Sequence, residues 1–126
     1  MKRSTRALGM AALAALLYGG WAFFANLGHG HAVAWRAATV QGCSSAFTTL
    51  VITSGIEALF ALRRGRPWRG LLAAVLPPTG SALIHATAHL GLGTPEVFRT
   101  VLPSVVMGYV FAATYLVGLS RAAPEG

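Results

Sequence analysis

Two stretches of the chain align with each other without a gap: ANLGHGHAVAWRA at residues 25–37 and AHLGLGTPEVFRT at residues 88–100. The shift between them is 88 − 25 = 63 residues, half of the 126-residue length. An alanine, a leucine, two glycines and an arginine coincide, and Trp35 aligns with Phe98. Self-similarity at a fixed shift is typical of a duplicated structural unit, so we expect two tandem copies of one fold.

The composition indicates a membrane protein. Hydrophobic residues make up 55% of the chain and charged residues 10%, and the mean hydropathy is +0.61. A soluble domain usually carries about a quarter charged residues. Four segments have the roughly 20 apolar residues that a helix needs to cross about 30 Å of hydrocarbon. We place these spans at Ala7–Leu27, Ala37–Leu62, Gly70–Leu92 and Val97–Leu119.

The net charge of +7 comes from basic residues that gather on one predicted side of the membrane. Lysines and arginines precede the first span, fill the turn at 63–69 and follow the fourth span, whereas only Arg36 and Arg99 lie on the other side. This bias follows the positive-inside rule. We therefore predict a bacterial-type inner membrane protein with both termini and the basic turn in the cytoplasm. Basic turns attract anionic lipid headgroups, so the charge does not indicate nucleic-acid binding.

We expect one transmembrane domain, 1–126, built from two helical hairpins at about 7–62 and 70–119. Their outer loops are predicted at Gly28–Arg36 and Gly91–Arg99. Because each hairpin contains two spans, the second hairpin starts on the same side of the membrane as the first. The fold class is thus an all-α membrane protein with parallel tandem repeats, related by an axis along the membrane normal.

A proline pair, Pro77-Pro78, interrupts the third span. Proline lacks a backbone donor and clashes with the preceding turn, so we expect a kink or a break there. In lipid, the freed carbonyls must be satisfied by protein or by a wet cavity. The pair is a candidate flexible element.

Span two carries a polar residue at every fourth position: Gln41, Ser45, Thr49, Thr53 and Glu57. Residues four apart are neighbours on a helix surface. Lipid penalises such a row, so it should face protein or water. We predict that it lines the path of a polar group or ion.

The positions 63 residues later on span four are small: Ser104, Gly108 and Ala112. Small residues let helix backbones approach closely, and hydroxyls can form hydrogen bonds across the seam. These three residues are predicted to pack helices together. The alternative for the whole polar row is therefore structural, with spans two and four crossing at the pseudo-twofold axis.

Glu57 is the only acidic residue inside a predicted span. It can reach towards Arg63 or Arg64 near the interface, as long side chains do. The alternative is a carboxylate that binds substrate or couples transport to proton movement.

All four histidines fall in the predicted outer half: His29, His31, His85 and His89. The spacing of His85 and His89 places two imidazoles on one helical face, which suits a shared metal. Zinc, copper or haem are the candidate groups, although the glutamate of a zinc-protease helix is absent. The alternative is that these histidines form hydrogen bonds to the loops, and we predict no cofactor as the first choice.

The two-hairpin layout, the basic turn and the Leu90-Gly91-Leu92 loop resemble those of the GtrA-like family, small four-helix membrane proteins that serve polyprenyl-linked sugars. The chain departs from that family's pattern at the ends of its even spans. There the family is rich in asparagine and arginine, whereas this chain has ALFAL at 58–62 and LVGL at 116–119. We do not assign membership.

Transport, or assistance to it, is the leading hypothesis, for a lipid-linked or small amphipathic substrate. The alternatives are a metal- or haem-binding membrane subunit and a structural accessory subunit. No nucleophile motif, paired-carboxylate site or phosphate loop favours an enzyme. Because four spans make a thin bundle, we expect a homo-oligomer or a larger membrane-protein partner in the bilayer.

Overall fold

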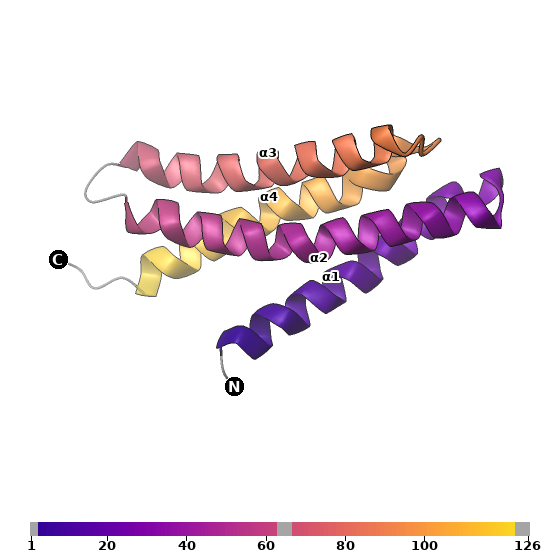
Figure 1. The fold of residues 1–126 in the computed structure, drawn as a ribbon. Helices are drawn as coiled ribbons and strands as arrows, with labels where there is room; N and C mark the ends of the chain where they lie inside the picture. The colour runs from indigo at the N-terminus through magenta and orange to yellow at the C-terminus, as the bar shows by residue number, and fades with distance from the viewer. Residues whose placement is uncertain (1–2, 63–66, 123–126) are drawn as a thin grey trace.

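The computed structural model describes residues 3–62 and 67–122 (Figure 1). Residues 63–66, which hold most of the predicted basic turn and the arginines proposed to meet Glu57, lie outside the described residues. The described part is helical, with four long helices and one turn of 3-10 helix. In chain order these are α1 (Arg3–Asn26), η1 (Leu27–His29), α2 (His31–Ala61), α3 (Pro67–Gly91) and α4 (Val97–Ala122).

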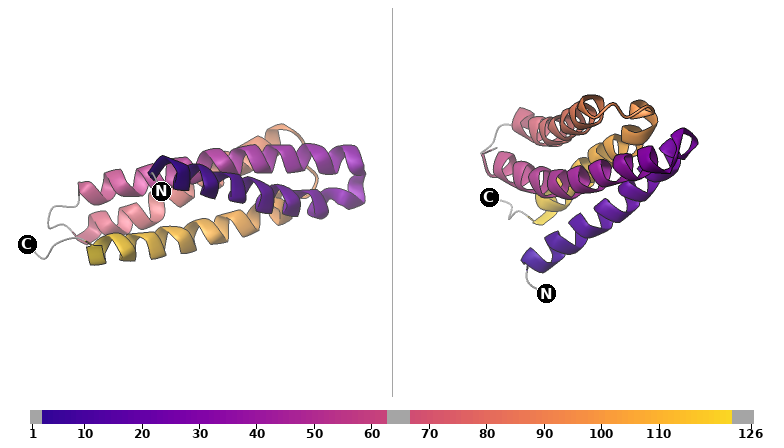
Figure 2. Two further views of the ribbon diagram at one scale, coloured as in Figure 1. Left: turned by 90° about the horizontal axis from the view of Figure 1, so that it is seen from below. Right: turned by 45° about the vertical axis from the view of Figure 1, so that its right-hand side comes forward.

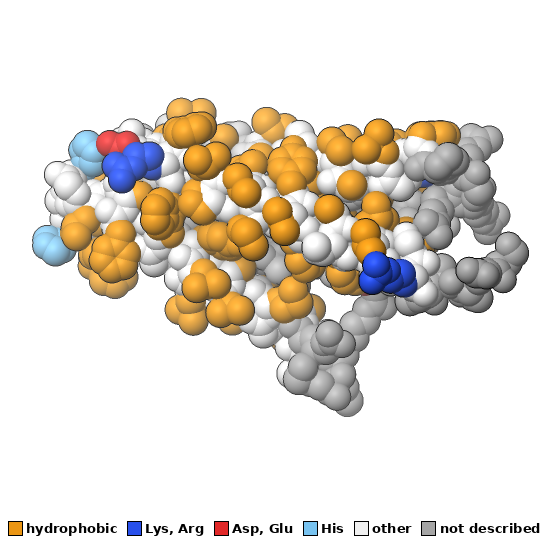
Figure 3. All heavy atoms as spheres, turned by 180° about the vertical axis from the view of Figure 1, so that it is seen from behind, with side chains coloured by type: hydrophobic (Ala, Val, Ile, Leu, Met, Phe, Trp, Pro, Cys, Tyr) orange, Lys and Arg blue, Asp and Glu red, His pale blue; other side chains and the backbone are white. Residues whose placement is uncertain are grey.

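Each of the four long helices contains a segment long and apolar enough to cross a membrane. The longest, α2, has 31 residues and is about 46 Å long at 1.5 Å per residue. Figure 3 shows hydrophobic side chains over most of one face, with charged side chains near its two ends. The prediction of an all-α protein with four helices long and apolar enough to span a membrane is confirmed.

The helices alternate in direction, so their ends form two distinct ends of the bundle (Figure 1). We call the end with residues 27–30 and 92–96 the loop end, and the opposite end the terminal end. Helix α2 packs against all three others, whereas α1 packs against α2 and α4 and makes no close backbone contact with described residues of α3. Figures 1 and 2 show that α1 diverges from the other helices towards its N-terminus.

The first connection is shorter than the sequence predicted. Helix α2 begins at His31, six residues before the expected Ala37, so Trp35 and Arg36 are helical and the predicted loop Gly28–Arg36 is wrong. The 3-10 turn Leu27–His29 and Gly30 together reverse the chain, and Gly30 has φ 100°, a conformation that favours glycine. The amide of Ala34 then donates to the Gly30 carbonyl at 3.0 Å and closes the first turn of α2.

Helix α3 runs through Pro77 and Pro78 without interruption, so the expectation of a break is wrong. Both prolines are buried where the neighbouring helices present glycine. A Cβ atom on Gly55 would lie 3.3 Å from Pro77 Cγ, and one on Gly108 would lie 3.7 Å from Pro78 Cβ. The neighbouring helices thus leave room for the two prolines, and α3 stays helical through them.

Two kinds of packing join the helices. At the seam of α1 and α2, a Cβ atom on Gly19 would lie 3.0 Å from the Ala38 carbonyl oxygen, and one on Gly42 would lie 3.1 Å from the Ala15 carbonyl oxygen. Such close backbone approach is typical of helix pairs in lipid. The apolar core lies elsewhere, among α2, α3 and α4, and consists of Ile52, Ile56, Ala73 and Ala112.

Candidate functional site

The buried side chain of Gln41 joins three helices through one amide group. Its Oε1 atom accepts a hydrogen bond from Nε2 of His89 on α3 at 2.7 Å. Its Nε2 atom donates to the hydroxyl of Ser104 on α4 at 3.0 Å and to that of Ser45, one turn along α2, at 3.4 Å. A fully satisfied polar group in lipid fixes which helices meet and in which register.

His89 is held from both sides. Because an amide oxygen only accepts, His89 carries its proton on Nε2, and its Nδ1 atom accepts from the hydroxyl of Thr94 at 2.9 Å. Thr94 lies in the connection between α3 and α4. The histidine therefore anchors this connection to Gln41 in the bundle interior.

His85 lies one turn before His89 on α3 and is also engaged at both ring nitrogens. Its Nδ1 atom lies 2.8 Å from Oγ of Ser44, and its Nε2 atom lies 3.3 Å from Oγ1 of Thr48. In a neutral imidazole one nitrogen donates and the other accepts, and hydroxyl groups can meet either need. The ring is thereby fixed against α2.

The four histidines do not form one ligand set. His29 is exposed at the loop end, 3.1 Å from Oε1 of Glu96, and His31 is exposed at the start of α2. His85 and His89 are buried, with both nitrogens of each ring hydrogen-bonded. Across residues 3–62 and 67–122, no group of three or more histidine, cysteine or acidic side chains is placed to hold a metal ion. The geometry gives the metal hypothesis no support.

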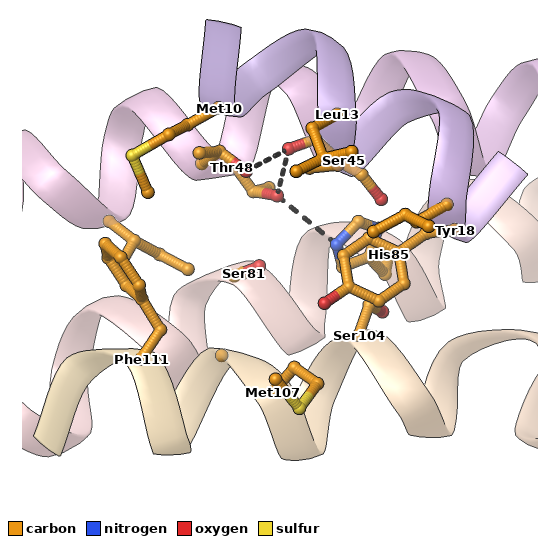
Figure 4. A pocket seen from close by; sticks show the side chains of 15 residues that line it. Met10, Leu13, Tyr18, Ser45, Thr48, Ser81, His85, Ser104, Met107 and Phe111 are labelled. Carbon is orange, nitrogen blue, oxygen red and sulfur yellow. Dashed lines mark hydrogen bonds between the residues drawn. The ribbon is translucent and has the colours of Figure 1, made fainter. Parts of the chain in front are cut away.

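All four helices line a cleft of about 290 Å³ in the middle of the bundle (Figure 4). Its floor is formed by buried polar side chains of α2 and α3: Ser45, Thr48, Ser81 and His85. Its rim is formed by apolar side chains of α1 and α4, which are between 44% and 59% exposed: Met10, Leu13, Leu17 and Met107.

The two ends of the cleft differ in polarity. Figure 4 shows Tyr18, His85 and Ser104 together at one end and Met10 and Phe111 at the other. The polar end lies towards the loop end of the bundle, since residue numbers rise that way along α1 and fall that way along α4. Within the described part of the chain, no lysine, arginine, aspartate or glutamate lines the cleft.

The cleft is bounded at the loop end by hydrogen bonds that tie α1 to α4. The Trp21 indole donates to the Arg99 carbonyl at 2.7 Å, and Asn26 donates to the Thr100 hydroxyl at 2.8 Å. The Asn26 side-chain oxygen also accepts from the amide of Glu96 at 3.3 Å. Towards the terminal end, α1 diverges (Figure 2), and the apolar rim lies along this diverging part.

The residues of the polar row predicted on α2 lie in four different environments. Ser45 and Thr49 line the cleft, whereas Gln41 lies behind its floor in the hydrogen-bond network. The hydroxyl of Thr53 donates to the Thr49 carbonyl of its own helix at 2.9 Å. Glu57 accepts a hydrogen bond of 2.5 Å from the Tyr115 hydroxyl on α4, nearer the terminal end. The row therefore does not form one continuous lining.

The small residues predicted on α4 face the interior of the bundle, at the cleft and in the apolar core. Ser104 accepts from Gln41, and both Ser104 and Gly108 line the cleft. Ala112 is buried in the apolar core beside Ile52 and Ile56. These positions let α4 approach α2 and α3 and also leave space for the cleft.

Sequence reasoning missed the contributions of α1 and of Ser81. No pattern in the apolar first span distinguished Met10, Leu13 or Tyr18 from residues that face lipid. Ser81 did have a signal, because it precedes His85 by four residues, the same spacing that separates His85 from His89. Ser81, His85 and His89 thus form a polar row on α3 with the same four-residue spacing as the row predicted on α2.

No protein-family model, no curated protein and no solved structure matches this chain. Its function is therefore inferred from the cleft and from the polar side chains around it.

Proposed function

We propose that this membrane protein transports, or assists the transport of, a small amphipathic or lipid-linked substrate whose polar part binds in the cleft. One observation carries the proposal: the cleft combines a floor of buried polar side chains with a rim of exposed apolar ones. Ligand sites typically have this character, mostly apolar with a few placed polar groups.

The rim supports access from the bilayer. Met10, Leu17 and Met107 belong to helices apolar enough to span the membrane, so the medium around them is lipid. Polar groups inside a bilayer are costly and are usually kept for a function. Ser45 and Thr49 are the members of the α2 row that we assign to the substrate, with Gln41 supporting them from behind.

The proposal includes a duplicated architecture. Gln41 and Ser104, which are 63 positions apart, are hydrogen-bonded to each other, as expected for equivalent residues beside a pseudo-twofold axis. Ser45 and Gly108, also 63 apart, both line the cleft.

The proposed orientation places the terminal end in the cytoplasm of a bacterial-type inner membrane, because the basic residues cluster there in the sequence. Reporter fusions at residue 66 and at both chain ends should all report the cytoplasmic side. A fusion at 66 that reports the opposite side from either terminus would contradict this orientation.

We also propose that the chain works as a homo-oligomer or beside a larger membrane protein. The support is that four helices make a thin bundle, since lipid alone can cover the large apolar side chains exposed on all four, such as Leu16, Phe47, Leu83 and Val106. Cross-linking in native membranes should give a dimer or a complex of higher mass. A protein that stays monomeric at every protein-to-lipid ratio would contradict this part of the proposal.

Transport can be measured in liposomes that contain the purified protein and a lipid with a fluorescent NBD group on its tail. Dithionite bleaches NBD only in the outer leaflet. Bleaching of more NBD-lipid than the outer leaflet holds at the start therefore reports movement across the bilayer. We would compare NBD-glucosylceramide with NBD-phosphatidylglycerol. The protein should accelerate the movement of at least one of them over protein-free liposomes.

The variant Ser81→Leu fills the floor of the cleft and should return the rate to that of protein-free liposomes. The matched control Thr87→Leu makes a comparable change at an exposed position of α3 that does not line the cleft, and it should retain the rate. If neither lipid moves faster, or if Ser81→Leu is as active as the wild type, the proposal fails.

A further inference from the structure

We infer that the cleft selects an uncharged head that both donates and accepts hydrogen bonds, such as the hydroxyl end of an amphipathic alcohol. This inference rests on the proposed function and names the substrate class of the same site. It follows from three features of the described lining: the lack of charged side chains, the hydroxyl groups that can still form hydrogen bonds, and the volume of the cleft.

Among the residues that the structure describes, none that lines the cleft is a lysine, arginine, aspartate or glutamate. A charged head that entered would lose its hydration without gaining an opposite charge, which is far more costly than burying a hydrogen-bonded neutral group. His85 offers no free ring nitrogen to a head in the cleft, because its Nδ1 and Nε2 atoms are engaged by the hydroxyls of Ser44 and Thr48. The floor is therefore suited to a neutral head.

Two hydroxyl groups of the lining point their protons at backbone carbonyls. Thr49 donates to the Ser45 carbonyl at 2.7 Å, and Ser104 donates to the Val101 carbonyl at 2.8 Å. The Thr49 oxygen keeps both lone pairs, and the Ser104 oxygen, which also accepts from Gln41, keeps one, so both can act as acceptors. This part of the cleft calls for a ligand that donates.

Ser81 and Tyr18 complete the site with hydroxyls that have no hydrogen-bond partner among the described residues. Ser81 is only 6% exposed, yet no fully enclosed side-chain oxygen or nitrogen in the described part lacks a partner. The Ser81 hydroxyl must therefore reach open space, and the cleft that it lines is that space (Figure 4). Such a hydroxyl can both donate and accept.

The volume of about 290 Å³ is at the small end of the range for ligand sites, roughly 300–1,000 Å³. It accommodates a compact head and the first part of a chain. With the head beside Tyr18, Ser81 and Ser104, the chain extends towards Met10 and Phe111 at the other end of the cleft (Figure 4). The apolar end of the cleft thus receives the apolar part of the ligand.

Photolabelling tests this selection directly. The intact protein in phosphatidylcholine nanodiscs is labelled with a dodecanol that carries a diazirine on its chain, and the labelled residues are mapped by mass spectrometry. The competitors are decanol, decanesulfonate and decyltrimethylammonium, which share a chain length and differ in charge. The concentration of each competitor in the membrane is measured with protein-free nanodiscs. The competitors are then compared by the membrane concentration at which each one reduces the labelling by half.

The labels should map to residues of α1 or α4 that line the cleft. Decanol should compete at a membrane concentration at least about tenfold lower than either charged compound. A tenfold factor corresponds to one charge-sensitive contact of about 1.4 kcal/mol. Ser81→Ala and Tyr18→Phe should each reduce this preference, and either variant suffices if the other does not fold. Equal or better competition by a charged compound would overturn the inference while leaving the transport site in place. Labelling that Ser81→Leu leaves unchanged would overturn the site itself.

Discussion

The half of the bundle near the loop end and the half near the terminal end are held together by different interactions. Near the loop end, buried polar side chains connect the helices, with Asn26 bonded to Thr100 and Gln41 bonded to both His89 and Ser104. Near the terminal end, the contacts are mainly apolar and include Ile52, Ile56, Ala73 and Ala112.

The difference matters because the solvent is lipid. Burying an apolar side chain between helices gains little there, since lipid tails are equally apolar. Hydrogen bonds and close backbone contacts therefore decide which helices stay together. This explains why α1 is tied to α4 at the loop end through Trp21 and Asn26, and why it can diverge farther along, where the cleft lies.

The variant Gln41→Leu should have the largest effect, because it removes the link between α2, α3 and α4. It leaves the donor of His89 without its acceptor inside the bundle. Each unsatisfied buried group costs about 1–3 kcal/mol, so we expect a loss of about 3 kcal/mol in the free energy of unfolding. The measurement is denaturation in detergent followed by circular dichroism.

The matched control for Gln41→Leu is Thr53→Val, which removes a hydroxyl from the same row of α2. That hydroxyl donates only within its own helix in the described structure, and such bonds add little stability. We expect a change below about 0.5 kcal/mol. Equal losses for the two variants would show that the polar network does not hold the loop half together.

The variant Gly42→Ala should have an intermediate effect. Its new Cβ atom would lie 3.1 Å from the Ala15 carbonyl oxygen on α1, so the helices must separate. Overpacking of this kind typically costs about 1–3 kcal/mol. The matched control Gly20→Ala meets nothing within 4 Å and should be neutral or slightly stabilising. Thermal unfolding of both variants in the same detergent would compare them, and a stable Gly42→Ala variant would mean that α1 is not held by close backbone contact.

The smallest effect is expected from Gly55→Ala, near the terminal end. The added Cβ atom would lie 3.3 Å from the ring of Pro77, whereas the one added in Gly108→Ala would lie at 3.7 Å from Pro78, an ordinary contact. A loss of about 1 kcal/mol is expected for the first and none for the second. Chemical denaturation of both proteins would test this order, and the reverse order would show that Pro77 and Pro78 do not pack against these glycines as described.

Much of the fold could be predicted from composition and spacing. Four helices long and apolar enough to span a membrane are confirmed, and the beginning of α4 at Val97 matches the prediction. The beginning of α2 was missed because the short turn Leu27–His29 and Gly30 connect the helices where a nine-residue loop was expected. The uninterrupted helix through Pro77 and Pro78 was missed because the sequence does not show the glycines of α2 and α4 that lie against these prolines.

The candidate site was less predictable. The row on α2 identified Ser45 and Thr49, which line the cleft, but it also included Thr53 and Glu57, which do not. Two partners of Gln41, His89 and Ser104, lie 48 and 63 positions away. The 63-residue shift of the repeat pointed to Ser104, whereas no spacing in the sequence pointed to His89.

By itself, the sequence determined that the chain has four segments long and apolar enough to cross a bilayer as helices, because hydrophobicity and span length are properties of consecutive residues. It also marked the polar residues that such helices have to shield. Only the tertiary structure decided that Gln41 and His89 satisfy each other, and that α1 and α4 leave a cleft over Ser81 and His85. The physical reason is that hydrogen bonds and cavities depend on the crossing of distant helices, which residue order does not specify.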